Sequence, residues 1–240
     1  MRSGNPALRA NTFTQARSYD STEVMSIQGT VNKTLLLLFA TVLTASWAWG
    51  NPVRILPFLM PAAIGGFVIA LVTVFKKEWA GITAPLYALV EGVFLGGISL
   101  VFEKSYPGIV IQAVGLTFGV LFCLLMAYKS RMIKVTDNFR LGVVAATGGI
   151  ALFYFASIIL GFFGIRIPLI HESGPIGIGF SLFVVVIASL NLVLDFDFIE
   201  KGSEARAPKY MEWYAAFGLM VTLIWLYLEM LRLLSKIRNR

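Results

Sequence analysis

The chain has 240 residues and a net charge of +7, yet only 14% of its residues are charged, while 58% are hydrophobic. Roughly a quarter of the residues of a soluble domain are charged, so this composition excludes an ordinary soluble protein. The basic residues lie in loops and tails, where they orient helices and meet anionic lipid, so the positive charge does not indicate nucleic acid as a partner.

The first 32 residues are polar and mixed, and no apolar stretch follows closely on the N-terminus. This pattern is not typical of a cleaved signal peptide. We expect residues 1–32 to form a cytosolic tail, residues 33–236 to form a membrane domain, and residues 237–240 to form a short basic tail.

Seven apolar runs of about 20 residues follow this tail, and a helix of that length crosses roughly 30 Å of hydrocarbon. Lipid admits only helices or closed barrels, and the runs lack the strict alternation of barrel strands. The sequence therefore predicts an all-α polytopic membrane protein with seven transmembrane helices. The runs are Thr34–Trp49, Ile55–Phe75, Ile82–Phe102, Gly108–Tyr128, Leu141–Phe163, Pro175–Phe198 and Tyr210–Leu234.

Tryptophans mark several ends of these runs, as expected for side chains at the membrane interface. Trp49 ends the first run, Trp79 precedes the third and Trp213 begins the seventh. Trp225 lies in the middle of the seventh run, so it must pack inside the bundle or against lipid.

Pairs of small residues four positions apart occur in three of the runs, and such pairs let helices approach closely in lipid. The spacing is common by chance, so each pair is weak evidence for a helix contact. The pairs are Gly92 and Gly96, Gly115 and Gly119, and Ala145 and Gly149.

The distribution of Lys and Arg predicts that the N-terminus is cytosolic, because cytosolic loops are rich in these residues. The N-terminal tail and the even-numbered loops carry most of them, whereas the odd-numbered loops hold only Arg54, Lys104 and Arg166. Seven spans place the basic residues after Arg232 on the opposite side, which conflicts with the rule. Either that tail tolerates its position or the last segment is re-entrant, and we favour seven spans.

Glu91 lies near the centre of the third run, and Gly92 follows it directly. A carboxyl group in hydrocarbon is costly, so such residues usually face a bundle interior or water and mark an ion or proton path. The alternative is a structural role, in which Glu91 is hydrogen-bonded to a neighbouring helix.

A second acidic group ends the sixth run. Asp195 and Asp197 are two residues apart and so point to nearly opposite sides of a helix, whereas Asn191 shares the face of Asp195. We expect Asn191 and Asp195 to point inward near the cytosolic mouth and Asp197 to face the interface or a basic loop residue. In the alternative, both aspartates are solvated at a helix end.

The last run carries two further acids. Glu229 has Arg232 three residues later, which predicts a salt bridge on one helix face. Glu212 lies at the cytosolic edge, where it can supply a second carboxylate near Asp195.

Enzyme signatures are few. His171 is the only histidine, Cys123 is the only cysteine and lies in an apolar run, and no cluster has metal-site spacing. The chain has no P-loop, Gly-x-Ser-x-Gly or His-Glu-x-x-His motif, so neither an enzyme nor a cofactor is predicted.

Two segments, Tyr87–Gly96 and Leu194–Phe196, resemble the Bax inhibitor family, and the end of the last run, Leu228–Leu234, resembles that family's closing helix. The resemblance covers roughly residues 33–236, and the opening Met1–Pro6 resembles a bacterial branch. It implies seven helices with the last helix at the centre of the bundle, and a pH-sensitive calcium leak.

In that family two aspartates on the last two helices share a proton, and the resemblance places Asp195 and Thr222 at their positions. A threonine can donate or accept a hydrogen bond but cannot share a proton as an acid pair does. Thr222 is also expected near mid-bilayer, whereas Asp195 is expected near the edge. Glu212 or Asp197 could replace the missing aspartate, and the sequence does not decide between them.

The leading hypothesis is a passive, pH-influenced cation pathway in a bacterial cytoplasmic membrane. Calcium prefers oxygen ligands, so Glu91 and Asp195 are the expected calcium contacts, with Asn191 nearby. A second hypothesis is a scaffold that binds a membrane protease or another membrane protein without ion transport. A proton-coupled transporter is less favoured, because the seven runs show no evident internal repeat.

Overall fold

The computed structural model describes residues 24–164 and 174–239. The tail before residue 24, the loop with His171 and the final residue lie outside this part. In the described part, seven helices are long and apolar enough to cross a membrane, which confirms the predicted all-α polytopic fold.

The helices lie close to the predicted runs, and most extend a few residues beyond them. The second span is divided because prolines interrupt backbone hydrogen bonding near its start. The elements are α2 (Ile27–Gly50), α3 (Pro52–Ile55), η3 (Leu56–Phe58), α4 (Leu59–Phe75), η4 (Lys77–Trp79), α5 (Ala80–Ser105), α6 (Ile109–Lys129), α7 (Asp137–Phe162), α9 (Pro175–Glu204) and α10 (Met211–Arg238).

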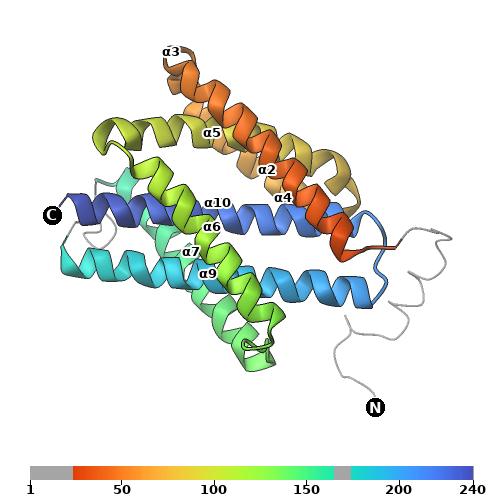
Figure 1. Ribbon diagram of the computed structural model, residues 1–240. Helices are drawn as coiled ribbons and strands as arrows, with labels where there is room; N and C mark the ends of the chain where they lie inside the picture. The colour runs from red at the N-terminus through yellow and green to blue at the C-terminus, as the bar shows by residue number, and fades with distance from the viewer. Residues whose placement is uncertain (1–23, 165–173, 240) are drawn as a thin grey trace.

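The last helix, α10, lies at the centre of the bundle. It runs alongside α9, while α2 and α6 cross in front of it in Figure 1. In the most apolar stretch of α10, 67% of the residues are buried, whereas in the most apolar stretch of α7 only 11% are buried. Buried positions such as Ala215, Ala216 and Phe217 follow one another, so they face different neighbours. Because α10 is one continuous helix of 28 residues, the seventh run does not form the re-entrant segment considered above.

Helices α2 and α5 pack most tightly, through the small residues Gly92 and Gly96. A Cβ at Gly92 would lie 2.5 Å from the backbone oxygen of Thr41, and one at Gly96 would lie 2.8 Å from the Cα of Ala45. By contrast, a Cβ at Gly115, Gly119 or Gly149 would meet nothing within 4 Å. Of the three predicted small-residue contacts, only the first therefore forms among the described residues.

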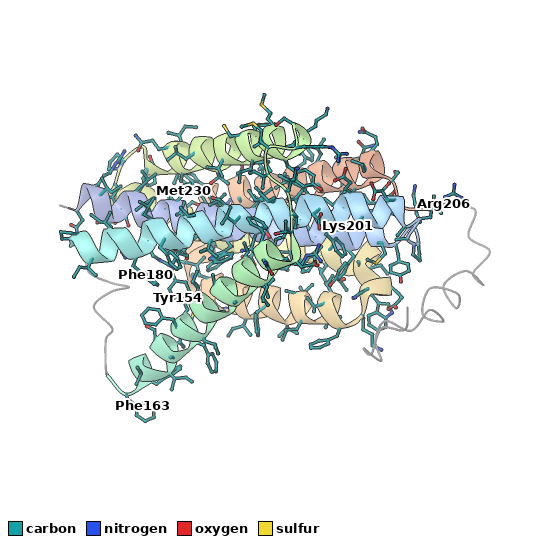
Figure 2. All side chains as sticks on the ribbon, turned by 90° about the horizontal axis from the view of Figure 1, so that it is seen from below. Tyr154, Phe163, Phe180, Lys201, Arg206 and Met230 are labelled. Atoms are coloured by element: carbon teal, nitrogen blue, oxygen red, sulfur yellow. The ribbon has the colours of Figure 1, made fainter. Side chains whose placement is uncertain are left out.

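Helix α7 lies at the edge of the bundle. Its buried residues are Val143 and Ile150, and it packs mainly against α9. Figure 2 shows α7 diverging from α9 toward Phe163. One wall of the bundle is therefore held by few contacts.

The two glycine environments provide a matched test of α2–α5 packing. We expect Gly96→Ala to lower the melting temperature in detergent, because its methyl group must push the backbone of α2 away. Gly119→Ala should leave it unchanged or raise it by an amount equivalent to about 0.5–1 kcal/mol, since alanine favours helices and the site is open. Equal melting temperatures for the two variants would contradict the packing described.

Candidate functional site

Asp195 lies on α9 at the interface with α10. Its Oδ2 atom is inaccessible to solvent and has no hydrogen-bond partner among the described residues. The Thr222 side chain of α10 lies beside this carboxyl group. Thr222 also donates to the backbone oxygen of Gly218, at 3.2 Å. A carboxyl group with one oxygen buried and unpaired has an unmet capacity to bind a cation, a proton or water.

The structure corrects the predicted difference in depth between Asp195 and Thr222. Helix α9 continues to Glu204, beyond the end of the apolar run, and α10 begins at Met211. Asp195 therefore lies about 14 Å along α9 from its end, and Thr222 about 16 Å along α10 from its start. Because the two helices are antiparallel neighbours, these residues lie at similar depths.

Asn191 is one helical turn from Asp195 but bonds elsewhere. Its Nδ2 donates to Thr147 Oγ1 of α7 at 2.7 Å and to the backbone oxygen of Ile187 at 2.9 Å. The side chain therefore connects α9 to α7, next to the carboxyl group that faces α10.

Asp197 lies in a cluster of ion pairs at the end of the bundle that holds the α9–α10 loop. Its Oδ2 accepts from Arg140 Nη2 at 2.6 Å and from Lys201 Nζ at 2.8 Å. Arg140 belongs to the first turn of α7, so Asp197 faces a basic residue, one of the two surroundings expected for it. Its charge is compensated within this cluster.

Glu212 is fully buried and holds the start of α2 against the start of α10. It forms ion pairs with Lys33 and, at 3.2 Å, with Lys209. Its Oε1 also accepts from the backbone N and the Oγ of Ser26, at 2.8 and 2.9 Å. A Cβ at Gly29 would overlap this carboxyl group, so the glycine provides its space.

These contacts correct the idea that Glu212 or Asp197 replaces the missing aspartate. Both carboxyl groups are occupied by basic side chains, and the residue that faces Asp195 is Thr222. The candidate site is thus an aspartate beside a threonine, without a second acid in contact.

Glu91 is buried on α5, where it faces α4. A Cβ at Gly66 would lie 2.6 Å from Glu91 Oε2, so this glycine makes room for the carboxyl group, and Tyr87 lies beside it. Asp195 faces α10, and the structure therefore places the two predicted calcium contacts at different helix interfaces.

A third polar cluster joins α7 to α10. Tyr154 donates to Glu229 Oε1 at 3.1 Å, while Arg232 Nη1 donates to the Tyr154 hydroxyl at 2.7 Å and to Glu229 Oε1 at 2.6 Å. The predicted pair of Glu229 and Arg232 is confirmed. Tyr154 and Thr147 were not predicted as part of a site, although their seven-residue spacing on α7 was a usable signal, since residues seven apart share a helix face.

A cavity of about 400 Å³ lies between α2, α5, α6 and α10. Its walls are mainly apolar, and neither Glu91 nor Asp195 lines it. A hydrogen bond of 2.6 Å between Ser99 and Tyr227 satisfies two of its polar side chains. The cavity is therefore separate from both predicted calcium contacts.

Nearly the whole chain resembles a known family of proteins. It matches the family described as Bax inhibitor 1 like over residues 5–239. The chain belongs to this family. No curated protein matches the sequence. Membership in the Bax inhibitor 1 like family, together with seven candidate spans, makes this an integral multi-pass membrane protein.

In residues 24–164 and 174–239, no three histidine, cysteine or acidic side chains converge as metal ligands. In this member of the Bax inhibitor 1 like family, Asp195 is the site residue whose carboxyl group has an unpaired buried oxygen. Among these residues it is therefore the strongest candidate for a functional site.

The burial of Glu212 predicts a structural function for it. We expect Glu212→Gln to lower the melting temperature in detergent by an amount equivalent to about 3 kcal/mol, the lower end of the range for breaking a buried ion pair, because Lys33 and Lys209 reach solvent. Glu78→Gln, the same change at an exposed position, should have little effect. Thermal unfolding followed by circular dichroism measures both, and equal stability of the two variants would refute the assignment.

Proposed function

We propose that this protein is a passive cation pathway that carries calcium, with Asp195 as the carboxylate that ions or protons reach between α9 and α10. The unpaired Oδ2 of Asp195 carries the proposal, because buried carboxyl oxygens otherwise find partners in the protein or in water. Calcium prefers such oxygen ligands. The Lys and Arg distribution supports an orientation with the N-terminus in the cytosol.

Thr222 gives the site a specific chemistry. A threonine hydroxyl carries one proton, and Thr222 donates it to the backbone oxygen of Gly218 while its side chain lies beside Asp195. When Asp195 is ionised, it provides a negative charge deep in the bundle. When it is protonated, it can donate to Thr222 instead, which removes the charge that attracts a cation. A single carboxyl group thus suffices to make cation passage depend on pH.

Calcium flux from proteoliposomes with an entrapped calcium dye tests the proposal. We expect Asp195→Asn to reduce flux by about tenfold, equivalent to about 1.4 kcal/mol of lost cation stabilisation, and to remove most of its pH dependence. Asp137→Asn is the matched control, because Asp137 is exposed at the start of α7.

The calcium flux of Glu91→Gln tests whether the carboxyl group between α4 and α5 belongs to the same path. The proposed path requires that Asp137→Asn matches the parent protein and Asp195→Asn does not. Parent-like flux from both Asp195→Asn and Glu91→Gln would refute the mechanism.

A second candidate function is a scaffold for another membrane protein. The small residues Gly115, Gly119 and Gly149 on α6 and α7 face open space, and such surfaces suit close contact with a foreign helix. Purification in mild detergent separates the two functions. A stoichiometric membrane partner without calcium flux would favour the scaffold.

A further inference from the structure

Helices α7, α9 and α10 carry their polar residues in the same order along the bundle. On each helix, polar residues are followed by an apolar section and then by further polar residues. Residues seven apart share a helix face, and this spacing relates Thr147 to Tyr154 on α7 and Thr222 to Glu229 on α10. On α9, Ser181 and Asp195 are two such intervals apart. The three polar faces therefore meet along one interface.

The first polar group lies on the side of the α9–α10 loop. It comprises Thr147, Asn191, Asp195 and Thr222, in which Asn191 bonds to Thr147 and Asp195 lies beside Thr222. The ion pairs of Asp197 lie farther toward the end of the bundle. This group thus lies between the ion pairs of Asp197 and the apolar middle of the interface.

The second polar group lies toward the C-terminal end of α10. It comprises Tyr154, Ser181, Glu229 and Arg232, of which Glu229 is 1% exposed. Ser181 is buried on α9, and its Oγ has no hydrogen-bond partner among the described residues. In the described part of the chain, the buried side-chain N and O atoms without a partner are this atom and Asp195 Oδ2. They lie on the same face of α9, one in each polar group, and water is the usual partner of such atoms.

An apolar layer separates the two polar groups. Ile150 of α7 and Val184 and Ile187 of α9 form a buried cluster, and Trp225 of α10 packs against it. This contact accounts for the tryptophan in the middle of the seventh run. Apolar constrictions of this kind block ions by excluding water.

Helix α7 forms one wall of this interface and has only two buried residues, Val143 and Ile150. It diverges from the bundle toward Phe163, and its contacts near the layer include Tyr154, whose ring lies 6.3 Å from that of Phe180 on α9 (Figure 2). A small displacement of α7 would separate Ile150 from Val184 while the tightly packed α2, α5 and α10 keep their positions. The structure thus combines an apolar layer with a helix that has few buried residues.

We propose that the interface of α7, α9 and α10 is the ion path, that the apolar layer is its closed gate, and that movement of α7 opens it. The proposal rests on the cation pathway proposed above and identifies its route and its barrier.

An isosteric substitution tests the gate. Val184→Thr adds a hydroxyl group to the apolar layer, and a helical threonine can satisfy that group at the carbonyl four residues earlier, so the fold should tolerate it. We expect a several-fold rise in calcium flux, because the layer then wets more easily. Val186→Thr, the same change at an exposed position on α9, should match the parent.

The flux outcomes distinguish the two proposals. Suppose that the parent protein conducts calcium, that Asp195→Asn does not, and that Val184→Thr and Val186→Thr give equal calcium flux. The proposed gate is then wrong, and the cation pathway stands. If the parent does not leak at all, the cation pathway fails, and the gate is then decided by labelling.

Cysteine labelling needs no calcium flux. In a Cys123→Ser background, a charged methanethiosulfonate reagent applied from the side of the α10 C-terminus should modify Ser181→Cys but not Asn191→Cys. Adding Val184→Thr should make Asn191→Cys reactive from that side. Unreactive Ser181→Cys from both sides, or an Asn191→Cys that reacts without Val184→Thr, would overturn the proposal.

Discussion

A polar group inside hydrocarbon must find its partner within the protein or in water carried by the protein, and this constraint organises the bundle. Glu212 and Glu229 are buried almost completely, and each is bonded to basic or hydroxyl side chains. Asp195 differs, because one of its oxygens lacks such a partner in the described part of the chain. The packing of α9 on α10 keeps this carboxyl group at depth.

The bundle is divided into a tightly packed part and a loosely packed one. On one side, Gly92 and Gly96 bring α5 against α2, and Glu212 fastens α2 to the start of α10. On the other side, α7 has two buried residues and depends on polar contacts through Arg140, Thr147 and Tyr154. Polar contacts inside a membrane exchange more readily than close backbone packing, so motion is expected where α7 meets α9 and α10.

The number, type and approximate limits of the spans could be predicted from the sequence. A helix needs about 20 consecutive apolar residues to cross the hydrocarbon core, so the length of each apolar run indicates a span. The depth of Asp195 relative to Thr222 was not predicted correctly, since two polar turns of α9 continue past the apolar run and hydrophobicity does not mark that end. Glu212 was also predicted to belong to the site. Lys33 and Ser26, which neutralise and bind Glu212, lie far away in the chain, and no local pattern shows that contact. The central position of α10 came from family resemblance, not from periodicity.

The two ends of the interface between α7, α9 and α10 have similar charges. At one end Asp197 pairs with Arg140 and Lys201, and at the other end Glu229 lies near Arg232 and Lys236, so one acid meets two bases at each end. On the proposed ion path, a cation would therefore meet a similar net positive charge at either end. Such a path should pass similar currents under the two polarities of membrane voltage.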